Sequence, residues 1–550
     1  MDRAERETRS EELARVAAEG LADLGEVASG LAKRRPFSRR RLMTGTAVLG
    51  ATASRGARGA AAAPRAGGQA APSPTAPSPA PAPAPAEGRQ WQHAVGNPRG
   101  SDIAVAVGRT SEGRFGVMFK DAPSFQPPDE ALHDLAVVMV DQRPPGLEPS
   151  DGDAGDNRDI TAGYTFLGQF IDHDMTRDTT PLGLQQSDPW ALTNFDTPWF
   201  DLQSVYGGGP TSDPQLYEAD GARLKIASPQ GIADLPRSGD GSAFLGDPRN
   251  DENLIIAQLH VAFLAFHNRL VSEGRSFAEA RRLTRWHFQW LIVNEFLPRV
   301  AGAAVMASYL SVPVTSVRPR FYRPKNPTKP FMPIEYSVGA YRFGHSMVRP
   351  EYEMNDAHTR AFFGAEGNDL RGSRVIPSEL QADWSYFFDV PGTARPDGLN
   401  FARLIDSNIA LPLHDLPPTV VPRDITPAFV DLAERNLLRG KRLGLPSGQD
   451  TAAAMGIRPL TNAELGIEDP RFEDRAPLWF YVLKEAELRH AGRHLGEVGA
   501  RIVAETILAF LVYDRSSYFW AKPGFTPMVE PFTVGQLLRH SRTGKNMPQS

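Results

Sequence analysis

The sequence predicts a mainly α-helical protein, built as one large domain with many irregular loops. Three observations support this fold class: apolar residues recur at helical spacing, strand-like alternation is scarce, and 49 glycines and 48 prolines supply long irregular connections. The chain of 550 residues is long enough to bury a large core. We expect the folded domain to span residues 89–550.

Seven segments show helical periodicity: 161–174, 248–272, 277–297, 336–348, 427–439, 477–489 and 498–513. The second is expected to begin with Asp247 as N-cap and Pro248 at its first position, and the fifth to end at Gly440. Segment 498–513 is apolar but contains Arg501 and Glu505, which favours a core helix over a membrane span. No stable membrane span is therefore expected.

The first 88 residues differ from the rest in composition. Residues 1–63 combine a basic stretch (SRRR at 38–41), a short apolar run and small residues, which resembles a twin-arginine export signal. Residues 64–88 are rich in alanine and proline and are typical of a disordered linker. We expect an exported protein, periplasmic or extracellular; the alternative is a cytoplasmic protein with a disordered N-terminus.

Charge and cysteine content exclude several function classes. The net charge of −5, with no basic stripe in the domain, gives no reason to expect a nucleic-acid partner. The chain has no cysteine, which excludes disulfides, thiolate nucleophiles and thiolate-held metal clusters. Redox chemistry would therefore need a cofactor held by histidine or carboxylate.

A polar cluster lies on the otherwise apolar helix 161–174. Gln169, Asp172 and His173 are spaced three and four residues apart and share one helical face, whereas Asp174 projects elsewhere. This pattern alone fits a core histidine paired with carboxylates, a non-haem metal site or an acid–base centre.

Three weaker patterns follow along the chain. Arg249 and Glu252 lie in the first turn of a predicted helix, where an arginine could stabilise an anionic oxygen or simply form a solvated ion pair. His345 follows a glycine on another predicted helix, and Asn436 and Arg439 share a face of a third. Spacing alone does not identify a cofactor or a reaction for these residues.

Two further histidines lie on the second predicted helix. His260 and His267 are seven residues apart and would share a face, as a metal pair could. Core or surface histidines without a metal are the favoured interpretation.

Four segments, taken in order, resemble the motifs of animal-type haem peroxidases, of the peroxidase–cyclooxygenase superfamily. They are 167–174 (LGQFIDHD), 246–253 (GDPRNDEN), 342–345 (RFGH) and 436–446 (NLLRGKRLGLP). The loops resemble those of a bacterial member. The resemblance implies an enzyme that reduces hydrogen peroxide and oxidises a small organic or halide donor.

The resemblance assigns the peroxide chemistry to one side of a haem. His173 would take a proton from one oxygen of hydrogen peroxide and return it to the other. Arg249 would stabilise the negative charge that develops as the O–O bond breaks, and Gln169 would line the cavity.

The other side of the haem b is implied to be held by the two later motifs. His345 would be the axial iron ligand, and Asn436 would accept its other ring proton. Arg439 and Arg342 would pair with the haem propionates.

Asp172 and Glu252 match positions that form ester bonds to haem in mammalian relatives. Covalent attachment and ordinary hydrogen bonding around a non-covalent haem both stay open. The family's additional methionine linkage is expected to be absent, because Asn253 occupies that position.

The segment 197–207 (TPWFDLQSVYG) resembles the family's calcium loop. The implied Ca²⁺ ligands are all oxygen donors: Asp174, Thr197, the Trp199 carbonyl, Asp201 and Gln203. A glutamine stands where the family usually has serine, and its longer reach changes the geometry of the site.

Two other functions compete with the peroxidase. A haem-dependent fatty-acid dioxygenase would need a tyrosine at the position of Arg342, and Tyr341 is expected to point in another direction around the helix. A non-catalytic haem- or calcium-binding adhesion module would need neither His173 nor Arg249, so their joint presence argues against it.

Overall fold

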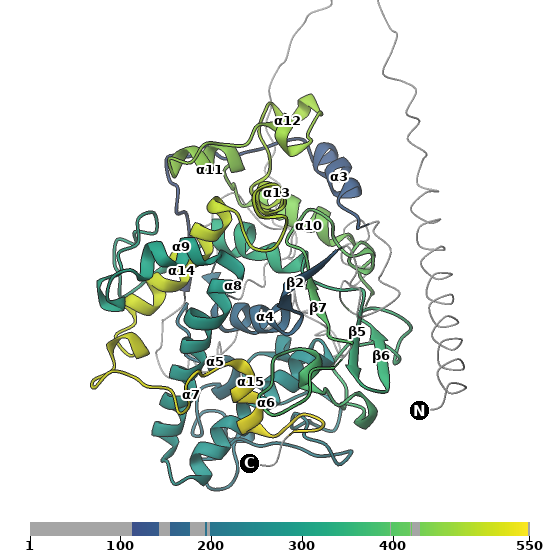
Figure 1. The fold of residues 1–550 in the computed structure, drawn as a ribbon, viewed down its shortest axis with the longest axis vertical. Coiled ribbons are helices and arrows are strands. Elements are labelled where there is room, and N and C mark those ends of the chain that lie inside the picture. Colours follow the sequence, from purple (N-terminus) through teal and green to yellow (C-terminus); the bar gives the residue numbers. More distant parts are fainter. Residues whose placement is uncertain are drawn as a thin grey trace, which may run out of the picture. The chain divides into compact units, whose positions relative to one another are not determined.

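The computed structural model describes residues 113–141, 155–176, 193–194, 198–396, 398–418, 420 and 430–547. The predicted export signal at 1–63, the linker at 64–88, the expected domain start at 89 and Thr197 lie outside the described residues. Within the described ranges the chain is mostly helical with a few short strands, which confirms the predicted fold class (Figure 1).

Helix α4 (Gly163–Met175) lies near the middle of the view (Figure 1). Above it lie α10 (Leu432–Arg442) and α13 (Leu478–His490), and below it lie α6 (Leu254–Ser272) and α7 (Phe277–Leu291). Every residue of α4 is buried except Gln169 and Asp172. Phe170 stacks on Phe263 of α6 (Leu254–Ser272), with ring centroids 4.6 Å apart. The helix predicted over 161–174 is therefore confirmed, and it is almost entirely buried.

The helix predicted over 248–272 divides into two elements. A 3-10 turn, η4 (Pro248–Asp251), comes first, and the α-helix α6 begins only at Leu254. Asp247 caps η4 by accepting from the Arg249 N–H at 2.9 Å, and Asn253 caps α6 by accepting from the Ile256 N–H at 2.9 Å. The Asn253 cap marks the start of α6 after η4. Arg249 was expected in the first turn of an α-helix, but it lies in the 3-10 turn.

The helix predicted over 277–297 is confirmed and runs slightly further. It begins as α7 (Phe277–Leu291), passes through a π-helical turn, η5 (Ile292–Phe296), and ends as α8 (Leu297–Ala301) before α9 (Ala303–Leu310). A Ser276–Glu279 capping box fixes its start.

The segment predicted as a helix over 336–348 is not α-helical. It consists of a π turn, η7 (Glu335–Gly339), followed by a 3-10 helix, η8 (Ala340–His345). The buried Glu335 carboxylate accepts backbone N–H groups of Met118 at 2.9 Å and Phe119 at 3.0 Å, which ties the π turn to a distant segment. The tighter winding of η8 changes the directions of the side chains near His345.

The three later helices are confirmed, but the one predicted over 427–439 begins at Leu432 and runs past 439. They are α10 (Leu432–Arg442), α13 (Leu478–His490) and α14 (Glu497–Tyr513). Helix α10 continues past Gly440, so this glycine is not the predicted C-cap. A Cβ at Gly440 would lie 3.2 Å from Leu445, and Gly444 takes the left-handed conformation (φ +70°) that ends the helix.

Seven short strands form three small sheets in the described part of the chain. β1 (Gly113–Gly116) pairs antiparallel with β3 (Thr193–Asn194) and parallel with β4 (Phe331–Pro333). The two-stranded sheets pair β2 (Asp156–Thr161) with β7 (Phe401–Arg403), and β5 (Glu351–Asn355) with β6 (His358–Ala361). Both pairs are antiparallel.

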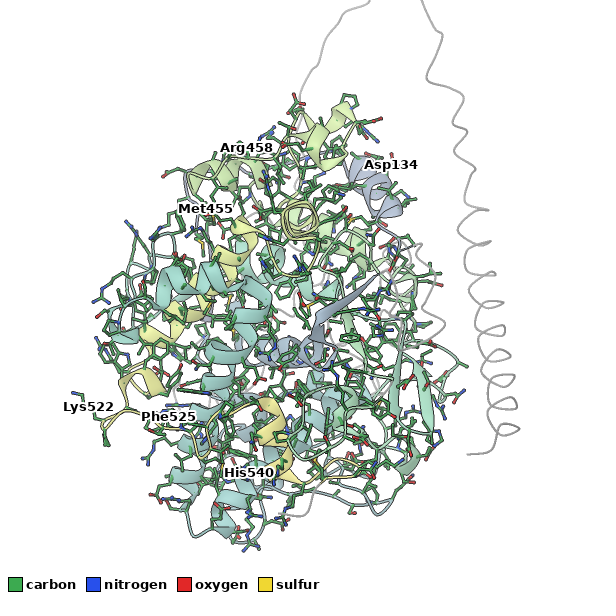
Figure 2. All side chains as sticks on the ribbon, in the orientation of Figure 1. Asp134, Met455, Arg458, Lys522, Phe525 and His540 are labelled. Carbon is green, nitrogen blue, oxygen red and sulfur yellow. The ribbon has the colours of Figure 1, made fainter. Side chains whose placement is uncertain are left out.

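The remaining α-helices among the described residues are α3 (Asp129–Val138), α5 (Gln203–Tyr206), α11 (Gly448–Ala454), α12 (Asn462–Leu465) and α15 (Val534–Ser541). Figure 2 shows Phe525 on the loop that follows α14. Its ring packs against the ring of His287 in α7, with centroids 5.0 Å apart. Among the described residues, α6 alone is long and apolar enough to cross a membrane, but 78% of that window is buried in the core.

Candidate active site

A cavity of about 240 Å³ lies between α4, η4, η8 and α10. Its lining includes His173 from α4 and His345 from η8, two histidines separated by 172 positions in the sequence. Arg249, Gln169, Asp172 and Glu252 also line it, as do Arg342, Asn436 and Arg439. All four sequence motifs therefore contribute side chains to one cavity.

His173 is buried on the regular helix α4. Its Nδ1 lies 2.8 Å from Oδ1 of Asn250, a residue of η4. Burial lowers the pKa of His173, and the nearby Arg249 guanidinium lowers it further. His173 is therefore neutral near neutral pH and can accept a proton.

Arg249 is held in place from several sides. Its guanidinium donates to the Asp247 carboxylate at 2.8 Å and to the Thr176 carbonyl at 2.6 Å, and its Nη1 lies 4.0 Å from the Asp172 carboxylate. A 3.3 Å bond to the His173 carbonyl ties it to α4. Its orientation is thus set by these acceptors, and not by the end of an α-helix as the sequence suggested.

Gln169, Glu252 and Asn253 link α4 to the junction of η4 and α6. The Gln169 amide donates to the Glu252 carboxylate and accepts from Asn253 Nδ2 at 3.2 Å. The Asp172 side chain is 32% exposed and accepts from the Thr176 hydroxyl at 3.0 Å. Both carboxylates considered for ester bonds therefore line the cavity.

His345 ends η8 and is half-buried. The nearest atom of Asn436 is its amide nitrogen, which lies 2.7 Å from His345 Nδ1, while Asn436 Oδ1 accepts from Arg342 at 3.0 Å. In this arrangement Asn436 presents its NH₂ group to the ring, so its role as acceptor of the ring proton stays a prediction for the haem-bound protein. The guanidinium can only donate, so it draws the amide oxygen toward itself and turns the NH₂ group to His345.

Three guanidinium groups line the His345 side of the cavity. Arg342 and Arg439 were expected there; Arg435 was not singled out from the sequence. Burial, followed by the charge of Arg439 one helical turn away, lowers the pKa of Arg435 to about 10. The sequence did contain a signal for Arg435: its i, i+4 spacing from Arg439 places both side chains on one face of the helix.

Tyr341 also lines the cavity, contrary to the expectation that it points in another direction. Adjacent residues of a 3-10 helix still point about 120° apart, so Tyr341 and Arg342 reach different partners from η8. The Tyr341 hydroxyl donates to the Gly168 carbonyl at 3.1 Å, and its ring stacks on Tyr336 with centroids 4.6 Å apart.

The predicted calcium ligands are only partly described. The buried Asp174 carboxylate reaches the loop after Trp199: it accepts from the backbone N–H of Leu202 at 2.9 Å and from the Ser204 hydroxyl at 3.0 Å. Asp201 accepts from the Gln203 N–H at 3.0 Å. No group of three or more His, Asp or Glu side chains suited to a metal occurs among the described residues.

His260 and His267 have separate partners on α6. His260 Nδ1 lies 3.1 Å from Asn250 Nδ2. His267 contacts the Tyr206 hydroxyl at 3.0 Å and the Ala222 carbonyl at 2.9 Å. They are core histidines with individual hydrogen bonds, as favoured from the sequence.

The lining of the cavity fits an iron porphyrin. Histidine is available on both sides of the space, guanidiniums for carboxylate side groups lie beside His345, and Phe343, Phe362 and Leu416 supply apolar walls. A Cβ at Gly344, next to His345, would meet no atom within 4 Å, so the backbone there faces open space.

Comparison with known proteins agrees with this geometry. The model of the family described as "Animal haem peroxidase" matches residues 177–467. Chorion peroxidase of Drosophila melanogaster is 26% identical over 379 residues, which cover 62% of this chain and 45% of that protein. The chain thus spans less than half the length of this relative.

Two solved structures resemble the fold. Peroxidase A from Dictyostelium discoideum has a TM-score of 0.54 at 18% identity, covering 80% of this chain and 93% of that one. A fatty acid alpha-dioxygenase from Arabidopsis thaliana has a TM-score of 0.50 at 13% identity, covering 77% and 75%. At these identities the likeness concerns the fold alone.

The family match covers part of the cavity. Arg249, Glu252, His345, Asn436 and Arg439 lie within residues 177–467. The α4 motif that contains His173 precedes the matched span, so its assignment depends on its place in the cavity.

Proposed function

The chain belongs to the animal haem peroxidase family, and from this membership we propose that it is a haem peroxidase that reduces hydrogen peroxide while oxidising a small organic or halide donor. One observation carries the proposal: His173 with Arg249, and His345 with Asn436, line the same cavity from different elements. A peroxidase needs a metal-binding histidine on one side of its cofactor and an acid–base group with a positive charge on the other.

The His173 side is suited to move a proton between the two oxygens of peroxide. When bound, haem supplies the redox-active iron at which the O–O bond is cleaved. His173 accepts a proton from one oxygen at its unbound ring nitrogen and returns it to the departing oxygen. Arg249 offsets the negative charge on that oxygen, and Gln169 orients the peroxide.

The His345 side would hold the cofactor. His345 would bind the iron, and Arg342, Arg435 and Arg439 would bind the propionates. A histidine that binds iron through Nε2 keeps its proton on Nδ1, so Asn436 must then present its oxygen. We infer that the Asn436 amide turns over when haem binds, and that Arg342 exchanges this oxygen for a propionate.

The optical spectrum of the haem-supplied full chain, recorded before and after hydrogen peroxide is added, tests the proposal. We expect a Soret band that shifts with peroxide and is lost or disrupted in His345→Ala. A Soret band without peroxide turnover would favour the adhesion module. No Soret band in the wild-type protein would contradict haem binding and favour a non-haem metal at His173.

Covalent attachment through Asp172 and Glu252 is a finer proposal. It is supported by their location on the cavity, with Glu252 fixed by Gln169. Acid–acetone extraction that leaves haem on the wild-type protein, but not on an Asp172→Asn/Glu252→Gln variant, is the expected result. Complete extraction from the wild type would exclude the ester bonds.

Calcium binding between Asp174 and the loop 197–203 is a second finer proposal. The approach of Asp174 to Leu202 and Ser204 supports it, because these contacts bring the carboxylate to the loop. We expect chelation to lower the Tm of the wild type, and added calcium to restore it, with neither effect in Asp174→Asn. An unchanged wild-type Tm would exclude a structural calcium ion.

A fatty-acid dioxygenase is the second candidate function, because Tyr341 lines the cavity. Its hydroxyl is engaged by the Gly168 carbonyl, which favours a structural role. Oxygen consumption with a long-chain fatty acid that disappears in Tyr341→Phe would support the dioxygenase. The peroxidase predicts no such consumption.

Export through a twin-arginine signal in residues 1–63 stays a proposal drawn from the sequence, as does bacterial membership. The N-terminal sequence of the protein recovered from its producing cells tests the signal. A mature chain that begins near residue 64 outside the cytoplasm is the expected result, and a full-length cytoplasmic chain would contradict it.

A further inference from the structure

Three buried side chains form a hydrogen-bonded chain that leads away from the cavity. His173, Asn250 and His260 have exposed fractions of 2%, 0% and 1%. His173 Nδ1 lies 2.8 Å from Asn250 Oδ1, and Asn250 Nδ2 lies 3.1 Å from His260 Nδ1. The chain joins α4, η4 and α6.

The direction of each hydrogen bond follows from what the groups can donate. Burial lowers the pKa of His260 to about 3, so its ring is neutral and has one acceptor nitrogen. The Asn250 NH₂ group can only donate, so His260 Nδ1 accepts from it. The Asn250 oxygen can only accept, so His173 carries its hydrogen on Nδ1.

The middle member of the chain is held independently of the cavity. The Asn250 N–H donates to the Asp247 carbonyl at 3.0 Å, which closes the 3-10 turn. The next residue, Asp251, forms a 2.6 Å ion pair with Arg237. Asn250 therefore meets His173 with a fixed backbone.

We propose that Asn250, oriented by His260, is a positioning residue that fixes the tautomer of His173 with Nδ1 protonated and Nε2 left as the proton acceptor. The assignment rests on the proposed peroxidase function for its consequence, because a base with the opposite tautomer would present an N–H to peroxide. His260 acts through Asn250 and does not itself line the cavity.

The tautomer can be measured before any haem is added. In the full chain labelled with ¹⁵N-histidine, the His173 signals, identified by their loss in His173→Gln, should show a protonated Nδ1 and a bare Nε2. The opposite tautomer would overturn the proposal. This measurement does not depend on peroxidase activity, so it separates failure of this inference from failure of the proposed function.

A kinetic test uses two small ligands of the haem-loaded full chain. Hydrogen cyanide must lose a proton as it binds, whereas carbon monoxide binding to the reduced protein needs no proton transfer. We expect Asn250→Leu to slow cyanide association roughly tenfold or more, with carbon monoxide association within about twofold of wild type. Equal slowing of both ligands, or no slowing of cyanide, would overturn the positioning role.

Two conservative variants complete the test. Asn250→Asp keeps an oxygen facing His173 and should retain most of the cyanide rate. His260→Phe keeps a ring but removes the acceptor, and should slow cyanide roughly threefold, with no further effect in the Asn250→Leu background. If Asn250→Leu does not fold, these two variants decide the test. The proposal is contradicted if Asn250→Asp slows cyanide binding as much as the loss of His173 does. It is also contradicted if His260→Phe does not slow cyanide binding. A wild type without a Soret band removes the proposed function, and the ¹⁵N measurement then stands alone.

Discussion

The polar groups on the His173 side of the cavity lie on an α-helix and a capped 3-10 turn, whereas those on the His345 side lie on a π turn, a 3-10 helix and α10. On the first side, His173 faces a hydrogen-bond acceptor, as a base requires. On the second side, His345 faces the NH₂ group of Asn436, the reverse of what an iron ligand requires. Under the proposed function, the His173 side already has the hydrogen bonding that a base needs, and the His345 side would acquire its final hydrogen bonding only when the cofactor binds.

The charges differ in the same way. Arg249 has carboxylates of Asp247 and Asp172 beside it. Beside His345, by contrast, burial lowers the pKa of Arg435 to about 10, and the positive charge of Arg439 one helical turn away lowers it further. A dianionic ligand such as haem would relieve this repulsion, so cofactor binding and the final geometry of this side are expected to be coupled.

The largest effect is expected from His173→Gln. Glutamine has a similar size but cannot take up a proton at neutral pH, so the rate of reaction with peroxide should fall by about 10²- to 10⁴-fold. Haem affinity, measured by titration of the Soret band, should stay near the wild-type value. His267→Gln, a buried histidine on α6 that does not line the cavity, is the matched control. Loss of haem in His173→Gln would show that the two sides are not independent.

Arg249→Lys is the second test of the His173 side. Lysine keeps the positive charge but cannot reproduce the several guanidinium bonds to Asp247 and the Thr176 carbonyl. We expect the peroxide rate to fall by about 10²- to 10³-fold, with donor oxidation affected only through that step. Stopped-flow measurement at saturating donor distinguishes an effect on the reaction with peroxide from an effect on donor oxidation. A rate within threefold of wild type would mean that charge alone suffices.

The sequence could predict which motifs converge, but not how they are oriented. Gln169, Asp172 and His173 were placed correctly because a long, regular helix fixes the directions of its side chains. The α-helical spacing assumed around His345 was wrong, because the buried Glu335 anchors a π turn there through distant backbone groups. No local pattern reveals such a contact.

Asn250 was missed for a related reason. The pattern from residue 248 onward is compatible with one continuous helix, and Asn253 was considered only as a replaced methionine. As the cap of α6, Asn253 divides the segment 248–272 into two elements. Asn250, in the first of them, faces His173. Whether an asparagine caps a helix depends on the backbone it meets, and sequence periodicity does not contain that information.

Two variants of Asn436 test the His345 side of the cavity. Asn436→Leu removes the acceptor that a bound His345 needs, so haem affinity should fall by about 10- to 100-fold. Asn436→Asp offers an oxygen in either orientation. Its haem affinity should therefore be higher than that of Asn436→Leu. Haem titration measures both. Equal affinities for the leucine variant and the wild type would contradict the inferred turn of the amide.

The smallest effect is expected on stability, where pH separates the two sides. Burial lowers the pKa of His260, behind the His173 side, from 6.5 to about 3. The unfolded chain then binds a proton that the folded chain does not, so this stabilisation is complete above pH 6.5 and is lost as the pH falls toward 3. Glu485 lies on α13, the helix that supplies Trp479 beside His345, and burial raises its pKa from 4.5 to about 7.

Glu485 therefore acts in the opposite direction. Between pH 4.5 and 7 the folded chain keeps a proton that the unfolded chain has released, so this stabilisation is complete below pH 4.5 and is lost as the pH rises through 7. Glu485→Gln, which preserves an acceptor for the Val498 N–H, should flatten the fall of Tm between pH 5 and 8 by roughly a few degrees. His260→Phe should flatten the acid side instead. Each variant should leave the slope of Tm in the other variant's pH range unchanged. A change there would show that the stability of the two sides of the cavity is coupled through the core. The independence inferred from their hydrogen bonding would then not extend to unfolding.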